Sequence, residues 1–355
     1  MKVLMTADAV GGVWSYALEL AGALAELDVA VTLAVMGAPL SAEQRSELRA
    51  ARVERCFAAD YALEWQQSWS SVRRSEEWLR EIAAVVEPDA VHVNGYVHAA
   101  VDWDVPVLVV AHSDVLSWFE AVRRQTAPAE WARYREEVGR GLAAADLVVA
   151  PTRVMLDELR RHYSVTAPSC VIPNGVAPTT AAAVKRRVVL AAARLWDEAK
   201  NVSALVRVAP RIAAPVELAG ELRSRQPSGV RTLGRLGRGA LRTRMAETAV
   251  FCAPARYEPF GLAPLEAALV GCALVLGDIP SLREVWGAAA LYVDPDDPDA
   301  LVAALERALT DHAELGARAR THARGYGARR MAEAYADAYE RLTAERLDSV
   351  TAVHA

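Results

Sequence analysis

Short apolar runs alternate with longer amphipathic stretches along nearly the whole chain, and this alternation constrains the fold more than any other feature. The short runs have the length of strands, and the stretches between them carry apolar residues at helical spacing. Continuous apolar runs are typical of strands that are buried on both faces, so the pattern predicts parallel sheets covered by helices on both sides. The expected strands are residues 2–7, 29–35, 90–94, 106–111, 146–150, 187–192, 215–219, 229–233, 249–253, 273–276 and 290–293.

The length of 355 residues predicts more than one domain, because a single hydrophobic core stops growing at roughly 250 to 300 residues. A turn-rich and then featureless segment, PTTAAA at residues 178–183, separates two series of alternating strands and helices. Two doubly wound α/β domains fit this organisation better than one extended sheet. We expect domains at residues 1–170 and 171–328, followed by a helical segment at 329–355.

The charge balance argues against a protein whose overall charge attracts nucleic acid or anionic membranes. The chain has 40 Lys and Arg against 45 Asp and Glu, a net charge of -5. No apolar run approaches the roughly 18 residues that span a bilayer, and Asp8, Gly11 and Gly12 interrupt the N-terminal stretch that resembles a secretory signal. We therefore expect a cytoplasmic protein, with its four cysteines reduced and buried.

The most specific motif is a pair of glutamates, Glu258 and Glu266, that follows the strand expected at 249–253. Gly261 between them permits close backbone approach, and a helix from Leu262 would direct free N–H groups at an anion. Glu266, just over one turn inside this helix, would accept hydrogen bonds from ligand hydroxyls. The arrangement suits a sugar nucleotide, and the alternative is two solvated charges at a helix start.

Two cations, Arg194 and Lys200, follow the strand expected at 187–192. Ligands bind at the carboxyl ends of strands in open α/β sheets, so these side chains are well placed for a diphosphate. Only three of the 40 basic residues are lysines, and Lys200 is the one that falls at such a position. A plain surface loop is the alternative.

The N-terminal half offers weaker candidates. Gly11 and Gly12 follow the first strand and resemble a phosphate-binding turn, although the full G-x-G-x-x-G is absent. His112 ends the strand expected at 106–111, where it would hydrogen-bond a sugar or polarise an acceptor or, alternatively, be a strand-end residue with no ligand. Trp118, six residues further on, is a candidate for acceptor binding because indole faces stack on sugars.

In combination, these motifs resemble the retaining glycosyltransferases of family 4, the E-x7-E type of the glycosyl transferases group 1. That family has the GT-B architecture, in which two Rossmann-like doubly wound domains face each other across a cleft. The resemblance runs nearly end to end, through Gly11-Gly12, His112, residues 172–176, Arg194 with Lys200, residues 258–266 and residues 279–285.

The resemblance implies a transfer in which a sugar moves from a nucleotide-diphosphate-sugar donor to an acceptor hydroxyl by same-face attack. The acceptor would be a small molecule, a glycan or a lipid-linked molecule that binds mainly the N-terminal domain. The donor would bind mainly the C-terminal domain, and the helical segment 329–355 would cross back onto the first domain.

The resemblance also implies roles for individual residues. Arg194 and Lys200 would bind the diphosphate, and Glu266 the ribose. Glu258 and the backbone around Phe260, Gly261 and Leu262 would bind the donor sugar. Gly11 and Gly12 would give backbone room near the phosphates and the acceptor, and His112 would contact the transferred sugar.

Several positions depart from the family pattern. Ala193 stands where a glycine usually precedes the arginine, and Arg194 and Lys200 are six positions apart where five is common. Ala177 replaces a usual aspartate, and an expected Gly-x-Gly is Gly220-Glu-Leu. A six-residue spacing still places Lys200 at the start of a helix.

Other functions are weighed against this one. Residues 223–244 hold seven arginines and no acid, which suits a nucleic-acid or lipid patch, part of the donor pocket or a solvated face. A nucleotide-sugar epimerase shares the GT-B fold, and a non-catalytic nucleotide-binding or nucleic-acid-binding protein is a further alternative. We expect no nucleic-acid partner, whereas peripheral membrane contact and the oligomeric state stay open.

We expect no cofactor and no metal. The D-x-D sequences at 102–104 and 294–296 spell the motif of metal-dependent glycosyltransferases. The first directly precedes a strand, and the second lies in a proline-broken turn that opens a helix.

Overall fold

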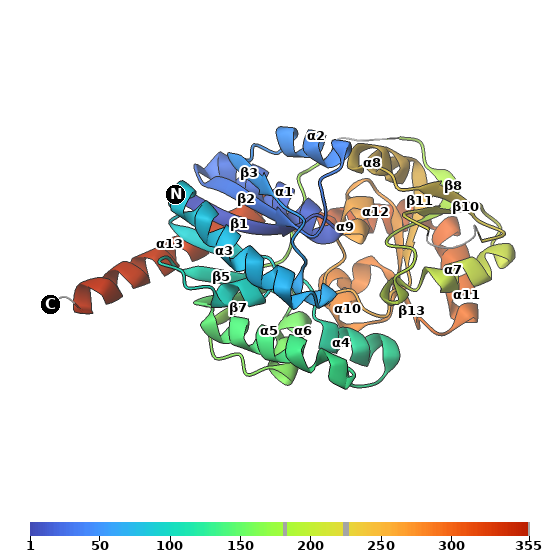
Figure 1. Cartoon of the computed structure of the whole chain (residues 1–355). Helices are drawn as coiled ribbons and strands as arrows, with labels where there is room; N and C mark the ends of the chain where they lie inside the picture. Colours follow the sequence, from blue (N-terminus) through green and yellow to red (C-terminus); the bar gives the residue numbers. More distant parts are fainter. Residues whose placement is uncertain (180–182, 223–226, 354–355) are drawn as a thin grey trace. The chain divides into compact units, whose positions relative to one another are not determined.

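The computed structural model describes residues 1–179, 183–222 and 227–353 (Figure 1). The chain divides into two compact units. The first contains Met1–Ser117, Thr126–Ala177 and Ala328–Ala355, and the second contains Trp118–Gln125 and Pro178–Gly327.

The first unit is built on a sheet of seven strands in the order β3-β2-β1-β4-β5-β6-β7, all parallel. The order reverses between β1 and β4, which are neighbours in the sheet. In a doubly wound sheet the carboxyl ends of two such strands are where ligands bind. The strands are β1 (Lys2–Asp8), β2 (Ala30–Met36), β3 (Arg55–Ala58), β4 (Ala90–Val93), β5 (Val107–Val110), β6 (Leu147–Ala150) and β7 (Ser169–Val171).

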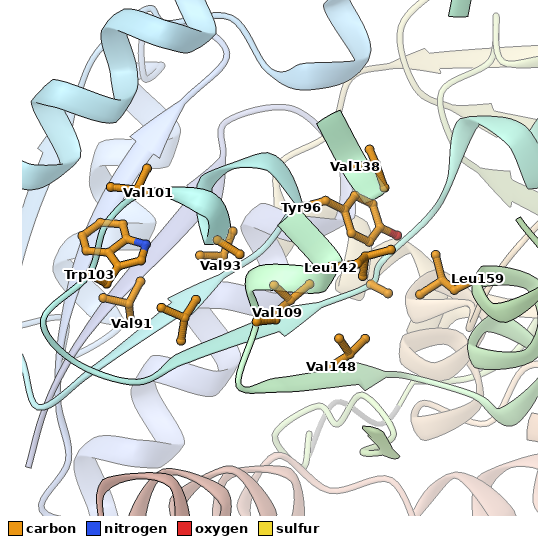
Figure 2. Packing of buried hydrophobic residues seen from close by; sticks show 14 of the residues in the cluster. Val91, Val93, Tyr96, Val101, Trp103, Val109, Val138, Leu142, Val148 and Leu159 are labelled. Atoms are coloured by element: carbon orange, nitrogen blue, oxygen red, sulfur yellow. The ribbon is translucent and has the colours of Figure 1, made fainter. Parts of the chain in front are cut away.

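Helices cover this sheet on both faces. On one face α3, α5 and α6 pack on valines of the central strands, and Figure 2 shows Val138, Leu142 and Leu159 against Val109 and Val148. On the other face α1 packs against the C-terminal helix α13. The helices are α1 (Gly12–Leu24), α2 (Ala42–Ala50), α3 (Trp69–Val86), α4 (Val115–Trp118), α5 (Ala132–Ala144), α6 (Arg153–His162) and α13 (Ala328–Val353).

The second unit repeats the plan with six parallel strands in the order β10-β9-β8-β11-β12-β13, which reverses between β8 and β11. The strands are β8 (Arg186–Ala192), β9 (Val216–Ala219), β10 (Arg231–Gly234), β11 (Thr248–Ala253), β12 (Ala273–Gly277) and β13 (Leu291–Val293). The helices are α7 (Val202–Val208), α8 (Arg238–Glu247), α9 (Leu262–Leu269), α10 (Pro280–Trp286), α11 (Pro298–Thr310) and α12 (His312–Ala323).

The predicted fold class, two doubly wound α/β domains, is confirmed. The units differ in detail from the expected ranges, because residues 171–177 belong to the first unit and residues 118–125 to the second. Residues 171–177 stay with the first unit because Ile172 N donates to Ala150 O, and Ala328 N donates to Val176 O. The alternation missed β3 and β7, two short strands at the sheet edges whose residues are only partly buried.

Two glycines of α5 provide an internally controlled test of the packing around β4. A Cβ on Gly141 would lie 2.1 Å from the carbonyl oxygen of Tyr96, whereas a Cβ on Gly139 would meet only Tyr163 at 3.9 Å. We expect Gly141→Ala to lower the free energy of unfolding by about 1 to 3 kcal/mol, because the helix must move away. Gly139→Ala is expected to raise it by about 0.5 to 1 kcal/mol, because alanine restricts the unfolded chain.

Urea-induced unfolding followed by tryptophan fluorescence checks both changes, since most tryptophans lie in the first unit. Equal effects of the two substitutions would contradict the close approach of α5 to Tyr96.

Candidate functional site

A cluster of polar side chains in the second unit lies where β8 and β11 end side by side. Lys200 lies in the loop after β8, and Glu258 lies in the loop after β11. The Lys200 Nζ atom is 2.8 Å from Glu258 Oε2, and each side chain is 21% exposed. The structure thus brings together two residues that the sequence motifs place 58 positions apart.

Asn201 ties three loops of this edge together. Its backbone is left-handed with φ 51°, and its buried Nδ2 donates to Pro254 O at 3.0 Å and to Pro295 O at 2.8 Å. These carbonyls belong to the loops after β11 and β13. Arg256 N also donates to Ala199 O at 2.8 Å. The position of the Lys200 backbone is therefore fixed by its neighbours on both sides.

Arg194 is held within its own loop. Its guanidinium donates to Asp197 Oδ2 at 2.8 Å and lies over the Trp196 ring at 5.6 Å. The side chain of Arg194 is 42% exposed, so part of the guanidinium faces solvent. The six-residue spacing to Lys200 is accommodated by a short 3-10 turn at Glu198–Lys200, which precedes α7.

Gly220 lies in the loop after β9 and packs closely against Ala193 in the loop after β8. Both positions depart from the family pattern. Gly220 has φ 148°, and a Cβ there would lie 2.0 Å from the carbonyl oxygen of Ala193. Glycine at 220 therefore permits the loop after β9 to contact the loop after β8 directly.

The expected helix start at Gly261 is confirmed, since α9 begins at Leu262 and Gly261 is its N-cap residue with φ 94°. A Cβ on Gly261 would approach Pro264 and Leu282 to 3.2 and 3.3 Å. The Phe260 ring is buried and packs edge-on against Tyr326. Only backbone atoms of Phe260 are therefore suited to a ligand.

Glu266 contacts two arginines of α8. Its Oε1 lies 3.4 Å from Arg238 Nε and 3.3 Å from Arg242, and its side chain is 12% exposed. Burial lowers the pKa of the Arg238 guanidinium, and the neighbouring Arg242 lowers it further. Both arginines belong to the run that was expected to form a nucleic-acid or lipid patch, part of the donor pocket or a solvated face, but their pairing with Glu266 was not predicted. Their signal was the i, i+4 spacing on one helix, opposite a carboxylate within an apolar helix.

Two further arginines of the arginine-rich run are also paired with carboxylates. Arg244 binds the buried Glu217 and Glu247, and Arg231 lies 3.5 Å from Glu217. Arg223 and Arg225 lie outside the described residues. Carboxylates of the same unit therefore balance part of the positive charge of this run.

The glycine turn predicted in the first unit is present. Gly11 follows β1 with φ 96°, α1 begins at Gly12, and both glycines are exposed. Asp8 Oδ1 accepts a hydrogen bond from Val10 N at 2.6 Å and shapes the turn.

His112 follows β5 and is partly exposed. Its Nε2 lies 2.7 Å from Oδ1 of Asn94, which follows β4 and which the sequence analysis did not single out. Burial lowers the pKa of His112 to about 3, so the ring is neutral at physiological pH.

Trp118 ends α4 and belongs to the second unit, whereas His112 belongs to the first. The Trp118 ring contacts Phe119 edge-on at 5.2 Å, and the Arg123 guanidinium lies 5.9 Å from its centre.

Among the described residues, neither D-x-D sequence lies beside a third side chain that could complete a metal site. Asp296 binds Arg256 and Arg124 through its carboxylate oxygens, and Asp102 and Asp104 are exposed ahead of β5. Over the described parts of the chain, no three His, Cys, Asp or Glu side chains form a group suited to a metal ion. None of the helices described is both long and apolar enough to cross a bilayer.

Two family models match the chain. The model described as Glycosyltransferase Family 4 matches residues 10–180, and the model described as Glycosyl transferases group 1 matches residues 186–311. Together they span both units. The chain belongs to glycosyltransferase family 4.

Solved structures confirm the GT-B fold of this glycosyltransferase. Sucrose-phosphate synthase from Thermosynechococcus elongatus is 18% identical with a TM-score of 0.78, over 97% of this chain and 100% of that one. HepE from Anabaena in complex with UDP and glucose is 16% identical with a TM-score of 0.74, over 96% and 100% of the two chains.

A curated relative, O-antigen chain mannosyltransferase B of Escherichia coli, is 42% identical over 66 residues. That match spans 19% of this glycosyltransferase and 17% of the relative.

Asn201 gives a test of how the loops of this site are held. We expect Asn201→Ala to lower the free energy of unfolding by about 2 to 4 kcal/mol, because two hydrogen bonds are lost and alanine tolerates a left-handed backbone less well than asparagine. Asn201→Gly loses the same bonds without the backbone strain and should be about 1 kcal/mol less destabilised.

Urea titrations followed by circular dichroism measure both variants of Asn201. Wild-type stability in either variant would show that the amide does not hold the loops after β11 and β13.

Proposed function

We propose that this protein is a retaining glycosyltransferase that moves a sugar from a nucleotide-diphosphate-sugar donor to an acceptor hydroxyl. The observation that carries the proposal is the Lys200–Glu258 ion pair at the adjoining ends of β8 and β11, with Arg194 in the same loop as Lys200. Cations there suit a diphosphate, and a carboxylate beside them suits the hydroxyls of the attached sugar.

Lys200 and Arg194 act on the leaving group in this proposal. As the bond from the sugar carbon to the diphosphate oxygen breaks, negative charge grows on the diphosphate. A preorganised donor aimed at such charge typically contributes about 3 kcal/mol, or a hundredfold or more in rate. Lys200 is well suited because Asn201 fixes its backbone, so little reorganisation is needed during the reaction.

Retention follows from attack on the face that the diphosphate leaves. The acceptor oxygen forms the new bond to the sugar carbon while the leaving phosphate oxygen takes the acceptor proton. No protein nucleophile enters this scheme. Glu266 would bind the ribose, since its second carboxylate oxygen is not the one facing Arg238 and Arg242.

We propose that the donor is a nucleoside-diphosphate hexose. The similar structure of HepE in complex with UDP and glucose and the similarity to O-antigen chain mannosyltransferase B support this proposal. The acceptor is proposed to be a small molecule, glycan or lipid-linked molecule in the cytoplasm, reached in the last case by peripheral membrane contact. No metal or other cofactor enters the scheme, so turnover should be unchanged by EDTA.

A thermal-shift screen against UDP, GDP and ADP, followed by matching nucleotide sugars such as UDP-glucose and GDP-mannose, tests the proposal. Stabilisation by one nucleotide and turnover of its sugar conjugate are expected. Conversion of donor into an isomeric nucleotide sugar without acceptor would instead indicate an epimerase.

Substitutions of Glu258 and Lys200 should have opposite effects on nucleotide binding, although both should lower turnover. Glu258→Gln removes the carboxylate that competes with phosphate for Lys200, so nucleoside diphosphate should bind several-fold more tightly while turnover falls at least tenfold. Lys200→Ala should weaken binding and lower turnover at least tenfold, as should Arg194→Ala. Lys200→Arg should also be slow, because a planar guanidinium does not replace a compact ammonium.

Calorimetry for the nucleotide and steady-state rates with the donor from the screen measure these effects. Arg211→Ala is the matched control, because Arg211 pairs with Asp299 at an exposed position of the same unit. Near-wild-type rates in any two of Glu258→Ala, Arg194→Ala and Lys200→Ala would remove the assignment of this site.

A further inference from the structure

A polar network within the first unit leads from the C-terminal helix to His112. Asn94 is its centre, and the amide of Asn94 is oriented by β1. Its Nδ2 lies 2.7 Å from the carbonyl oxygen of Thr6, and its backbone N donates to Thr6 Oγ1 at 2.9 Å. A carbonyl oxygen only accepts, so the side-chain atom facing it is the nitrogen, and Oδ1 faces the opposite way.

Two imidazoles meet this amide oxygen. His112 Nε2 lies 2.7 Å from Asn94 Oδ1, and His92 Nε2 lies 3.1 Å from the same atom. An amide oxygen accepts and does not donate, so both Nε2 atoms carry the proton. Since a neutral imidazole has only one N–H, both Nδ1 atoms are then hydrogen-bond acceptors.

The contact at the other ring nitrogen of His92, Nδ1, is consistent with a proton on Nε2. His92 Nδ1 lies 2.6 Å from the hydroxyl of Tyr339 in α13, which has a proton to donate. Hydrogen bonds therefore run in one direction from Tyr339 through His92 to Asn94, and His112 donates to Asn94 from the other side. Among the described residues, none hydrogen-bonds to His112 Nδ1. Since His112 is partly exposed, the lone pair on Nδ1 is available to a ligand.

The groups around the His112 ring are uncharged. Tyr16 of α1 packs against it edge-on at 4.5 Å, and Tyr335 of α13 lies behind Tyr16 and His92. Burial raises the pKa of Tyr16 and Tyr335, so both hydroxyls stay protonated.

The nearest carboxylate in sequence is Asp114, and it is engaged elsewhere. It accepts hydrogen bonds from Ser117 and Tyr163. Burial lowers the pKa of both His92 and His112 to about 3, so neither imidazole takes a second proton in the neutral range.

We propose that Asn94, supported by His92 and Tyr339, is a positioning residue that holds His112 in the tautomer whose Nδ1 accepts a hydrogen bond from a sugar hydroxyl. This inference rests on the proposed glycosyl transfer for its kinetic consequence. His112 then acts as a neutral acceptor that orients the sugar, and it is not the general acid or base of the reaction.

The tautomer is measured without any substrate. In protein labelled with ¹⁵N-histidine, the His112 and His92 resonances, assigned with His112→Asn and His92→Asn, should show an unprotonated Nδ1 and no titration between pH 5 and 8. A proton on His112 Nδ1, or titration of His112 near pH 6.5, would overturn the inference whatever the enzyme turns over.

Two near-isosteric changes at Asn94 give the kinetic test, with UDP-glucose or the nucleotide sugar that the screen selects. Asn94→Leu removes the acceptor and should lower kcat/KM about tenfold at every pH. Asn94→Asp keeps an acceptor but adds a charge, which raises the pKa of His112. Its kcat/KM should therefore fall below about pH 7, where Nδ1 becomes protonated, and return toward wild type at higher pH.

Tyr339→Phe, which removes the donor to His92, should lower kcat/KM about two- to fivefold. Ser75→Ala is the matched control, because the Ser75 hydroxyl contacts His98, another buried histidine outside the network, at 2.8 Å. In Ser75→Ala, the tautomers of His112 and His92 and the pH profile of kcat/KM should equal those of wild type. A flat pH profile for Asn94→Asp, or wild-type kinetics for Asn94→Leu, would overturn the inference. If the protein turned over no nucleotide sugar, that result would count against the proposed function instead. The ¹⁵N spectra would still decide the tautomer.

Discussion

Reversal of strand order within a parallel sheet is the constraint on which both candidate sites depend. At β1 and β4, and again at β8 and β11, neighbouring strands run in the same direction while the chain leaves them toward opposite sides. Their carboxyl ends are therefore adjacent, and no connection crosses the space above them. The glycine turn and Asn94 occupy one such position, and Lys200 and Glu258 occupy the other.

Charges at the second position are neutralised by partners from the same unit. Lys200 is paired with Glu258, Arg194 with Asp197, and Glu266 with two arginines of α8. An unpaired charge in a half-buried site is costly, so these pairs hold the side chains in place without a ligand. In the proposed function, a bound diphosphate would replace these carboxylates as the partner of the cations, so the net electrostatic gain would be smaller than the cations alone suggest.

The sequence predicted those parts of the molecule that depend on local patterns. Central strands are apolar along their whole length because both faces are covered, and the helix start at Gly261 has a local cause in a glycine with positive φ. Edge strands such as β3 gave no such pattern, because their residues are half exposed. The pairing of Glu266 with Arg238, and of His112 with Asn94, depends on which strands and helices become neighbours, and spacing in one sequence carries no record of that.

The contact between Tyr339 and His92 joins residues 247 positions apart, and α13 packs on α1 at the other end of the chain. The first unit is therefore not a segment that folds ahead of the second during synthesis. Its sheet can form early, but His92 Nδ1 lacks the Tyr339 hydroxyl and one face of the unit lacks its covering helix until α13 has been synthesised. The nascent protein thus carries a first unit without α13 throughout the synthesis of the second, and removal of α13 would take away the hydroxyl that contacts His92.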